Sequence, residues 1–255
     1  MGEEQRETSS CQTLSFRNLI VDSQGTIINL TINRPRTLNN LSVETLRELV
    51  CFFESILYRK EVKVVVVRGS GDKAFIAGAD IKELYGFNVF DSLWFCDLGH
   101  KLFNLMEQVP QLIIAVIDGY CMGGGFDFAM SCDIRIATPK ARIAHTAAKM
   151  GLITGFGGTQ RLTRLLNLRK AKEIFYTANI ISADDALKMG IVHEVISEEE
   201  LKKRLEELLK RITAFSWGKI YLLKNLLNKT KDFTRKSYMK YEIFTTYTRC
   251  CHGLD

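Results

Sequence analysis

Two glycine-rich segments have residue types that could do chemistry. The first is Ala77-Gly78-Ala79-Asp80, and the second is Gly123-Gly124-Gly125, just before a predicted helix. Small residues let a ligand approach the backbone, and peptide N–H groups at a helix start point outward. The two segments could aim two N–H donors at one carbonyl oxygen and form an oxyanion hole, in which one donor is typically worth about 3–4 kcal/mol. Taken singly, each segment also fits an ordinary tight turn.

Other common site types are not supported by the residue patterns. The segment Gly69-Ser70-Gly71 imitates the start of a dinucleotide fingerprint, but its sixth position is Ala74 and no helix pattern follows. The sequence has no Walker A motif, no Gly-x-Ser-x-Gly elbow and no Cys/His spacing typical of zinc. We therefore expect neither a metal nor a nucleophilic serine.

The elements that must position these segments alternate between strands and helices, which predicts an α/β fold. Strands are predicted by β-branched or alternating runs at 16–22, 27–32, 62–67, 112–117, 134–137 and 192–196. Helices are predicted at 41–53 with Ser42 as N-cap, at 123–130, at 160–166, after Ser182, and at 197–212 with Ser197 and Glu200 in capping-box spacing. The region from about residue 197 is predicted to be helical and to pack on its own core or on a neighbouring subunit.

Composition indicates one globular chain of 255 residues, 46% of them hydrophobic, with no apolar run of the roughly 18–20 residues that a membrane span needs. Residues 1–10 are polar, lack a secretory pattern and are expected to form a flexible tail. The seven cysteines are odd in number and have no CxxC spacing, which favours reduced thiols in a cytoplasmic protein.

The net charge of +6 is concentrated near the C-terminus. Residues 201–255 contain 13 Lys or Arg against 5 Asp or Glu, a net of +8, so the remainder carries about −2. Such a region could attract a phosphorylated ligand or RNA, but it also fits solvated helix faces. Its tyrosines fit helix packing as well as base stacking, so nucleic acid binding is not expected.

Four ordered blocks resemble the enoyl-CoA hydratase/isomerase (crotonase) superfamily. They are NRP at 33–35, KAFIAGADIKE at 73–83, GYCMGGGFD at 119–127 and GGTQRL at 157–162. Their order and spacing also match. The resemblance is clear from about residue 16 to residue 196 and looser in the helical region beyond.

The resemblance implies a spiral of repeated ββα units over residues 11–196. A C-terminal trimerisation region would follow at 197–255, in a homotrimer or a dimer of trimers. It implies a coenzyme A thioester as substrate, with no permanently bound cofactor. The oxyanion donors would be the backbone N–H groups of Ala79 and Gly124. The residues implied to contact CoA or substrate are Arg36, Thr37, Leu38, Ala77, Gly78, Ala79, Asp80, Ile81, Lys82, Gly123 and Gly124.

The sequence departs from the family at the two acids that hold and activate water. The first position is Asp127, one methylene shorter than the family's glutamate, and the second is Ala147, which cannot move a proton. Asp127 is therefore either catalytic or a structural residue in the first turn of a helix, where a negative charge is favourable. His145 could carry protons in place of the lost acid, or it could simply be packed. An anion such as bicarbonate could also fill the vacated space.

We expect hydration of a 2-enoyl-CoA with Asp127 orienting the water. Loss of the second acid argues against a fast standard hydratase and more strongly against a double-bond isomerase. The alternatives are decarboxylation of a malonyl-type CoA, which needs no second acid, and a non-catalytic CoA- or RNA-binding homologue. The sequence also stops about twenty residues before the usual family end, so weaker CoA binding is expected.

Overall fold

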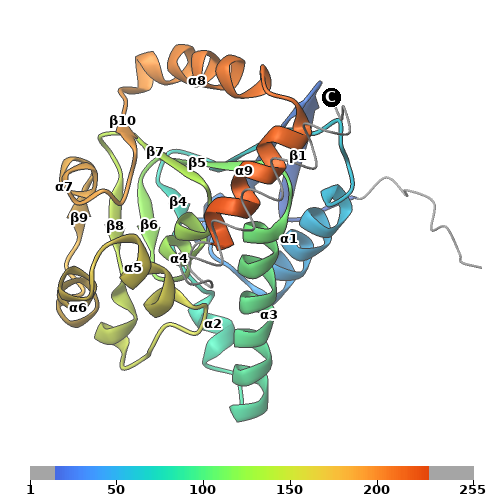
Figure 1. Cartoon of the computed structure of the whole chain (residues 1–255). Coiled ribbons are helices and arrows are strands. Elements are labelled where there is room, and N and C mark those ends of the chain that lie inside the picture. Colours follow the sequence, from blue (N-terminus) through green and yellow to red (C-terminus); the bar gives the residue numbers. More distant parts are fainter. Residues whose placement is uncertain (1–14, 230–255) are drawn as a thin grey trace, which may run out of the picture.

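The computed structural model describes residues 15–229, which form two β-sheets with helices around them (Figure 1). The larger sheet has the order β1-β2-β3-β5-β7-β10, and the smaller has the order β4-β6-β8-β9. The larger sheet contains β1 (Leu19–Gln24), β2 (Ile27–Ile32), β3 (Val64–Gly69), β5 (Leu112–Ile117), β7 (Ile134–Ala137) and β10 (Glu194–Val195). The smaller sheet contains β4 (Ala74–Ile76), β6 (Tyr120–Met122), β8 (Arg142–Ala144) and β9 (Ile181–Ser182). The predicted α/β class is confirmed.

The chain passes repeatedly from the larger sheet to the smaller one and returns through helices. β1 and β2 form an antiparallel hairpin, whereas β2, β3, β5, β7 and β10 pair in parallel. In the smaller sheet β4, β6 and β8 are also parallel. Because parallel strands end at the same edge of a sheet, the segments that follow β4 and β6 are brought together.

Serine caps fix the starts of three predicted helices. The side chains of Ser42, Ser182 and Ser197 accept hydrogen bonds from backbone N–H groups three residues ahead. For Ser197 this is half of the predicted capping box, since Glu200 reaches the Ser197 hydroxyl instead of its N–H. The helices are η1 (Pro35–Thr37), α1 (Val43–Ile56), α2 (Ile81–Leu84), α3 (Val89–Gln108), α4 (Gly124–Ser131), η2 (Thr146–Met150), α5 (Gly158–Leu165), α6 (Leu168–Thr177), α7 (Ala183–Met189), α8 (Glu198–Thr213) and α9 (Trp217–Lys229).

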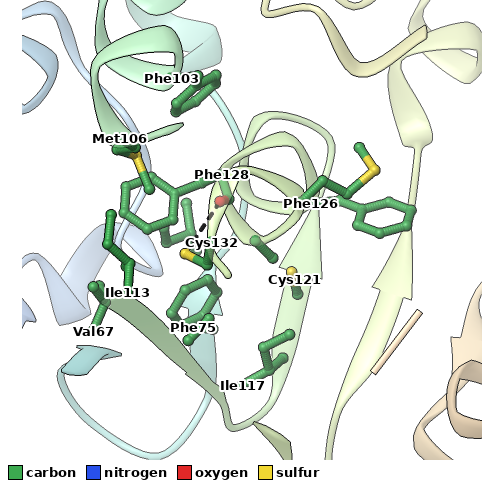
Figure 2. Close-up of a cluster of buried hydrophobic side chains, with 14 of the residues drawn as sticks. Val67, Phe75, Phe103, Met106, Ile113, Ile117, Cys121, Phe126, Phe128 and Cys132 are labelled. Atoms are coloured by element: carbon green, nitrogen blue, oxygen red, sulfur yellow. Dashed lines mark hydrogen bonds between the residues drawn. The ribbon is translucent and has the colours of Figure 1, made fainter. Parts of the chain in front are cut away.

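The main core lies between the two sheets and the helices α1, α3 and α4. In β3, Val65 and Val67 face this core, whereas Val64 and Val66 face the opposite side, as strand alternation requires. Figure 2 shows the centre of the core, where Phe75 of β4 and Phe103 of α3 approach Phe128 of α4. The ring centroids of Phe128 lie 6.0 Å from Phe75 and 5.9 Å from Phe103, both edge-to-face. This packing fixes α4 against both sheets.

The C-terminal helices of the described chain pack on their own core. Leu201, Leu205 and Leu209 of α8 join Val64 and Val66 in a second cluster on the outer face of the larger sheet (Figure 1). The α9 helix is held by a buried lysine, Lys224, which lies 2.9 Å from a carboxylate oxygen of Asp133 and donates to two backbone carbonyls. The predicted division at residue 196 remains a prediction. Its tail at 1–10 and the region 230–255 lie outside the described residues.

Several elements were not predicted from sequence. No strand was predicted between residues 69 and 80, but this segment contains β4, whose three residues are all buried. Strands of two or three residues, such as β6, β8 and β9, are too short to give a periodic signal. The 20-residue α3 was missed because its first half is apolar on exposed faces, with Phe90 81% exposed and Leu93 60% exposed.

The described residues contain no group of three or more His, Cys, Asp or Glu side chains arranged to hold a metal ion. Within 15–229, every helix is too short or too polar to cross a lipid bilayer. The cysteines of this part of the chain, Cys51, Cys96, Cys121 and Cys132, are free thiols.

Candidate active site

The two glycine-rich segments meet at the ends of β4 and β6. Residues 77–80 follow β4, residues 123–125 follow β6, and these strands pair in parallel. A β-carbon built on Gly78 would lie 3.9 Å from the Gly124 nitrogen, and one built on Gly124 would lie 3.5 Å from the Ala79 nitrogen. The backbone nitrogens of Ala79 and Gly124 therefore border one small space.

Both backbone N–H groups are available to a ligand in the described part of the chain. Ala79 pairs with Leu41 in a parallel bridge that uses the Gly78 carbonyl and the Asp80 N–H, which leaves the Ala79 N–H pointing away. Gly124 is the first residue of α4, where N–H groups have no partner inside the helix. Two backbone donors thus border one space, and their role as an oxyanion hole stays a prediction.

Glycine is required at this junction for two different reasons. Gly78 has φ +116°, a conformation that side chains disfavour, and its β-carbon would lie 3.2 Å from the Met122 carbonyl oxygen. Gly125 has no room for a side chain, because a β-carbon there would lie 2.0 Å from the Ile76 carbonyl oxygen. The close approach of α4 to β4 depends on this missing side chain.

The predicted CoA-contacting segment 36–38 lies beside the first glycine segment. The Ala77 N–H donates to the Leu38 carbonyl at 3.1 Å. Buried Asn39 donates to the carbonyl oxygens of Ser70 and Ala74, which ties this turn to β4. Arg36 and Leu38 line a cavity of about 270 Å³ together with Lys73. Segments that are distant in the sequence are thus joined at one edge of the site.

Asp80 has a structural role in this arrangement. One of its carboxylate oxygens accepts a hydrogen bond from the Lys82 N–H and begins α2, while the other lies 3.3 Å from an Arg34 guanidinium nitrogen. The side chains of Arg36, Thr37, Ile81 and Lys82 are exposed around the same edge.

Asp127 lies three residues after Gly124 on α4, so the two share a helix face. Its side chain is fully buried, and each carboxylate oxygen has a hydrogen-bond partner. His145 Nε2 lies 2.9 Å from Oδ1, and the Thr154 hydroxyl donates to Oδ2 at 2.5 Å. The first turn of α4 also favours a negative charge there.

His145 is buried between aromatic rings, with its centroid 4.5 Å from Phe175 and 6.0 Å from Phe126. Its Nδ1 atom has no hydrogen-bond partner among residues 15–229. Two residues further along the chain is Ala147, on η2, which was predicted to replace the family's second acid. The Thr146 hydroxyl of the same turn lies 4.0 Å from a β-carbon built on Gly123.

The segment between η2 and α5 closes the site from another side. The Phe156 ring would lie 3.0 Å from a β-carbon on Gly124, so it covers the second donor segment. Arg161 holds this segment by donating to the Phe156 carbonyl oxygen at 2.8 Å and to Glu107 at 2.6 Å. At the start of α5, a β-carbon on Gly158 would lie 1.9 Å from Asp127 Oδ1.

The thiol nearest to this carboxylate is not suited to nucleophilic chemistry. Burial, followed by the charges of neighbouring groups that include Asp127, raises the pKa of the Cys121 thiol well above its usual range. Its Sγ also donates to the Gly125 carbonyl oxygen. Cys121 is therefore a protonated core residue.

A larger cavity of about 840 Å³ lies elsewhere, between α9 and the ends of α4 and α5. None of the predicted site residues lines it. Donor geometry therefore identifies the site better than cavity size does.

Sequence reasoning missed the residues that surround Asp127, namely Thr154, Phe156 and Gly158. Gly158 was part of a recognised block, but nothing in that block indicated its contact with Asp127. Thr154 lies 27 positions from Asp127 and carries no spacing signal.

Comparisons with known proteins identify the family of this chain. Residues 22–250 match the family model described as enoyl-CoA hydratase/isomerase. A short-chain-enoyl-CoA hydratase of Clostridium acetobutylicum is 38% identical over 85% of this chain and 83% of the relative. A crotonyl-CoA hydratase of Syntrophomonas wolfei is 37% identical over 78% of this chain and 76% of the relative.

Solved structures support the same assignment. The crystal structure of an enoyl-CoA hydratase from Bacillus anthracis superposes with a TM-score of 0.87 at 32% identity, covering 91% of this chain and 90% of that one. The sequence blocks, the fold and the family match agree, and the chain belongs to the enoyl-CoA hydratase/isomerase family.

Proposed function

We propose that this protein hydrates short-chain 2-enoyl-CoA thioesters. The observation that carries the proposal is the meeting of two free backbone N–H groups, on Ala79 and Gly124, with the carboxylate of Asp127 one helical turn away. The relatives named as short-chain-enoyl-CoA and crotonyl-CoA hydratases support the choice of reaction and chain length.

The backbone donors would bind the thioester carbonyl oxygen. As water adds to the β-carbon, the electrons of the double bond move towards that oxygen and form an enolate. Donors fixed in place before the reaction stabilise this charge without reorganising, typically by about 3–4 kcal/mol for each donor.

Asp127 would act first as the base and then as the acid. Its carboxylate takes a proton from water while the water oxygen bonds to the β-carbon. The resulting carboxylic acid then gives a proton to the α-carbon, which restores the carboxylate and completes the addition of one water. A single acid–base group performs both steps because Ala147 supplies none.

The cavity beside residues 36–38 would hold a phosphate-bearing part of CoA. Arg36 and Lys73 both line it and carry positive charge. Residues 77–82, with the exposed Lys82, would follow the pantetheine arm towards the oxyanion hole. No permanently bound cofactor is needed for this reaction.

A homotrimer or a dimer of trimers and a cytoplasmic location complete the proposal. Phe215 and Leu223, in the C-terminal helical region, are 57% and 61% exposed, which supports an apolar contact between subunits. Light scattering coupled to size exclusion would give a mass of three or six chains, and a monomer would refute this part.

The test is loss of the conjugated enoyl-thioester absorbance when crotonyl-CoA is mixed with the protein. Asp127→Asn should lower kcat at least tenfold. This expectation is conservative, because general acid–base catalysis typically contributes about 100- to 10,000-fold. Asp184→Asn is the matched control, since Asp184 also lies in the first turn of a helix but is exposed on α7.

Calorimetric CoA binding should be unchanged in both variants. If Asp127→Asn retains full turnover, the role given to Asp127 is wrong. If the wild type binds CoA without turnover of crotonyl-CoA, hydration is wrong, and carbon dioxide release from a malonyl-type CoA becomes the reaction to measure.

A further inference from the structure

The carboxylate of Asp127 is held from two sides by side chains distant in sequence. His145 follows β8 and lies against Oδ1, while Thr154 precedes α5 and donates to Oδ2. Both Asp127 and His145 are almost completely buried, at 0% and 1% exposure. Each oxygen of the carboxylate has one hydrogen bond from the protein, so its plane is fixed.

The tautomer of His145 follows from its surroundings. Asp127 as a carboxylate only accepts hydrogen bonds, so the proton between the two groups lies on Nε2 of His145. Nδ1 has no partner among the described residues and faces an aromatic environment. Burying an unpaired lone pair at Nδ1 costs less free energy than burying an unpaired N–H group on a charged ring. The neutral Nε2–H form is therefore favoured.

Gly158 packs closely against the pair of Asp127 and His145. Gly158 begins α5, and a β-carbon there would overlap Asp127 Oδ1 and lie 2.9 Å from His145 Nε2. The segment containing Thr154 also places the Phe156 ring over Gly124. Thr154, His145 and the oxyanion segment therefore belong to one packed unit.

We infer that His145 and Thr154 are positioning residues that let the single carboxylate of Asp127 serve as both base and acid. The inference rests on the proposed hydration. Each donor occupies one lone pair of its carboxylate oxygen, so a proton taken from water resides on a remaining lone pair. From there Asp127 gives the same proton to the α-carbon. The donors thereby compensate for the acid missing at Ala147.

Paired variants separate hydrogen bonding from packing. Thr154→Val and His145→Leu remove the donors at similar volume, whereas Thr154→Ser and His145→Gln restore an O–H or N–H donor. We expect the first pair to lower kcat for crotonyl-CoA at least tenfold with KM changed less than about threefold, since fixed orientation acts on the transition state. The second pair should recover most of kcat.

A double-mutant cycle tests whether the effect passes through Asp127. In the Asp127→Asn background, Thr154→Val should lower kcat no further, because the residues act as a unit. Circular dichroism melting and calorimetric CoA binding on all variants show whether the fold is retained. If His145→Leu and His145→Gln reduce kcat equally, and Thr154→Val and Thr154→Ser do the same, the inference is overturned.

Deuterium exchange distinguishes this inference from the proposed function. Butyryl-CoA incubated with the protein in heavy water should exchange its α-hydrogens, because this needs the oxyanion hole and one base without any hydration. Exchange that depends on His145 and Thr154 in a protein inactive on crotonyl-CoA would refute hydration and uphold the positioning role. Absence of both reactions in the wild type would overturn both proposals.

Discussion

Gly158→Ala would test the packing of the proposed acid–base group with a single added methyl. Its β-carbon would lie 1.9 Å from Asp127 Oδ1, whereas real β-carbon contacts essentially never fall below 3.0 Å. One of the two atoms must therefore move by at least about 1 Å. The backbone is not the obstacle, because Gly158 is a helical residue outside the positive-φ glycines.

A misplacement of about 1 Å typically costs about 100-fold in rate. We expect kcat for crotonyl-CoA to fall by roughly that factor. Overpacking should also cost about 1–3 kcal/mol of the free energy of unfolding. The melting temperature should then fall by roughly 2–4 °C for each kcal/mol.

The assay is initial-rate loss of enoyl-thioester absorbance, with thermal melting alongside. Gly86→Ala is the control, because its β-carbon would meet its nearest neighbour, the Glu83 carbonyl oxygen, at an ordinary 3.4 Å. Wild-type kcat and melting temperature in Gly158→Ala would refute the contact between Gly158 and the Asp127–His145 pair.

Three further predictions concern stability. Lys224→Met should lower the free energy of unfolding, measured with urea, by several kcal/mol. It leaves Asp133 and two carbonyls without their buried donor, and each unsatisfied group costs about 1–3 kcal/mol. An unchanged midpoint would contradict this prediction. Ser42→Ala should cost about 1 kcal/mol by removing the α1 cap, whereas Ser42→Asn should restore it, as measured by thermal melting. Burial, followed by the Arg135 charge, lowers the pKa of His193 below its usual 6.5, so the unfolded state binds more protons and stability falls as pH drops from about 7 to 5. His193→Asn, which keeps an acceptor for the Arg135 N–H, should show a shallower loss in urea unfolding at these pH values, and an identical slope would refute the assignment.

Sequence patterns predicted the elements with a long periodic signal. The runs at 27–32, 112–117 and 134–137 coincide with β2, β5 and β7. β2 shows the alternation of a half-buried strand, and β5 shows the continuous apolar run of a buried parallel strand. The serine caps were predictable because capping is local to a few residues. Short strands and α3 were not predicted, since their burial depends on partners far along the chain.

The candidate site also has parts that the sequence predicted and parts that depend on contacts between distant segments. The two donor segments were predicted from residue types and their spacing, whereas the shortened acid at Asp127 and the missing acid at Ala147 are predictions from the family resemblance. Whether Ala79 and Gly124 face one space depends on the parallel pairing of β4 with β6, which is a long-range contact.

The surroundings of Asp127 were decided by tertiary structure alone. His145 and Thr154 lie 18 and 27 positions away, and they reach its carboxylate only because β8 and the segment before α5 pack against α4. The sequence left His145 open as a proton carrier or a packed residue, and the fold makes it a buried hydrogen-bond partner of Asp127. Local propensity thus determined which residues could do chemistry, while packing between distant elements determined which of them touch.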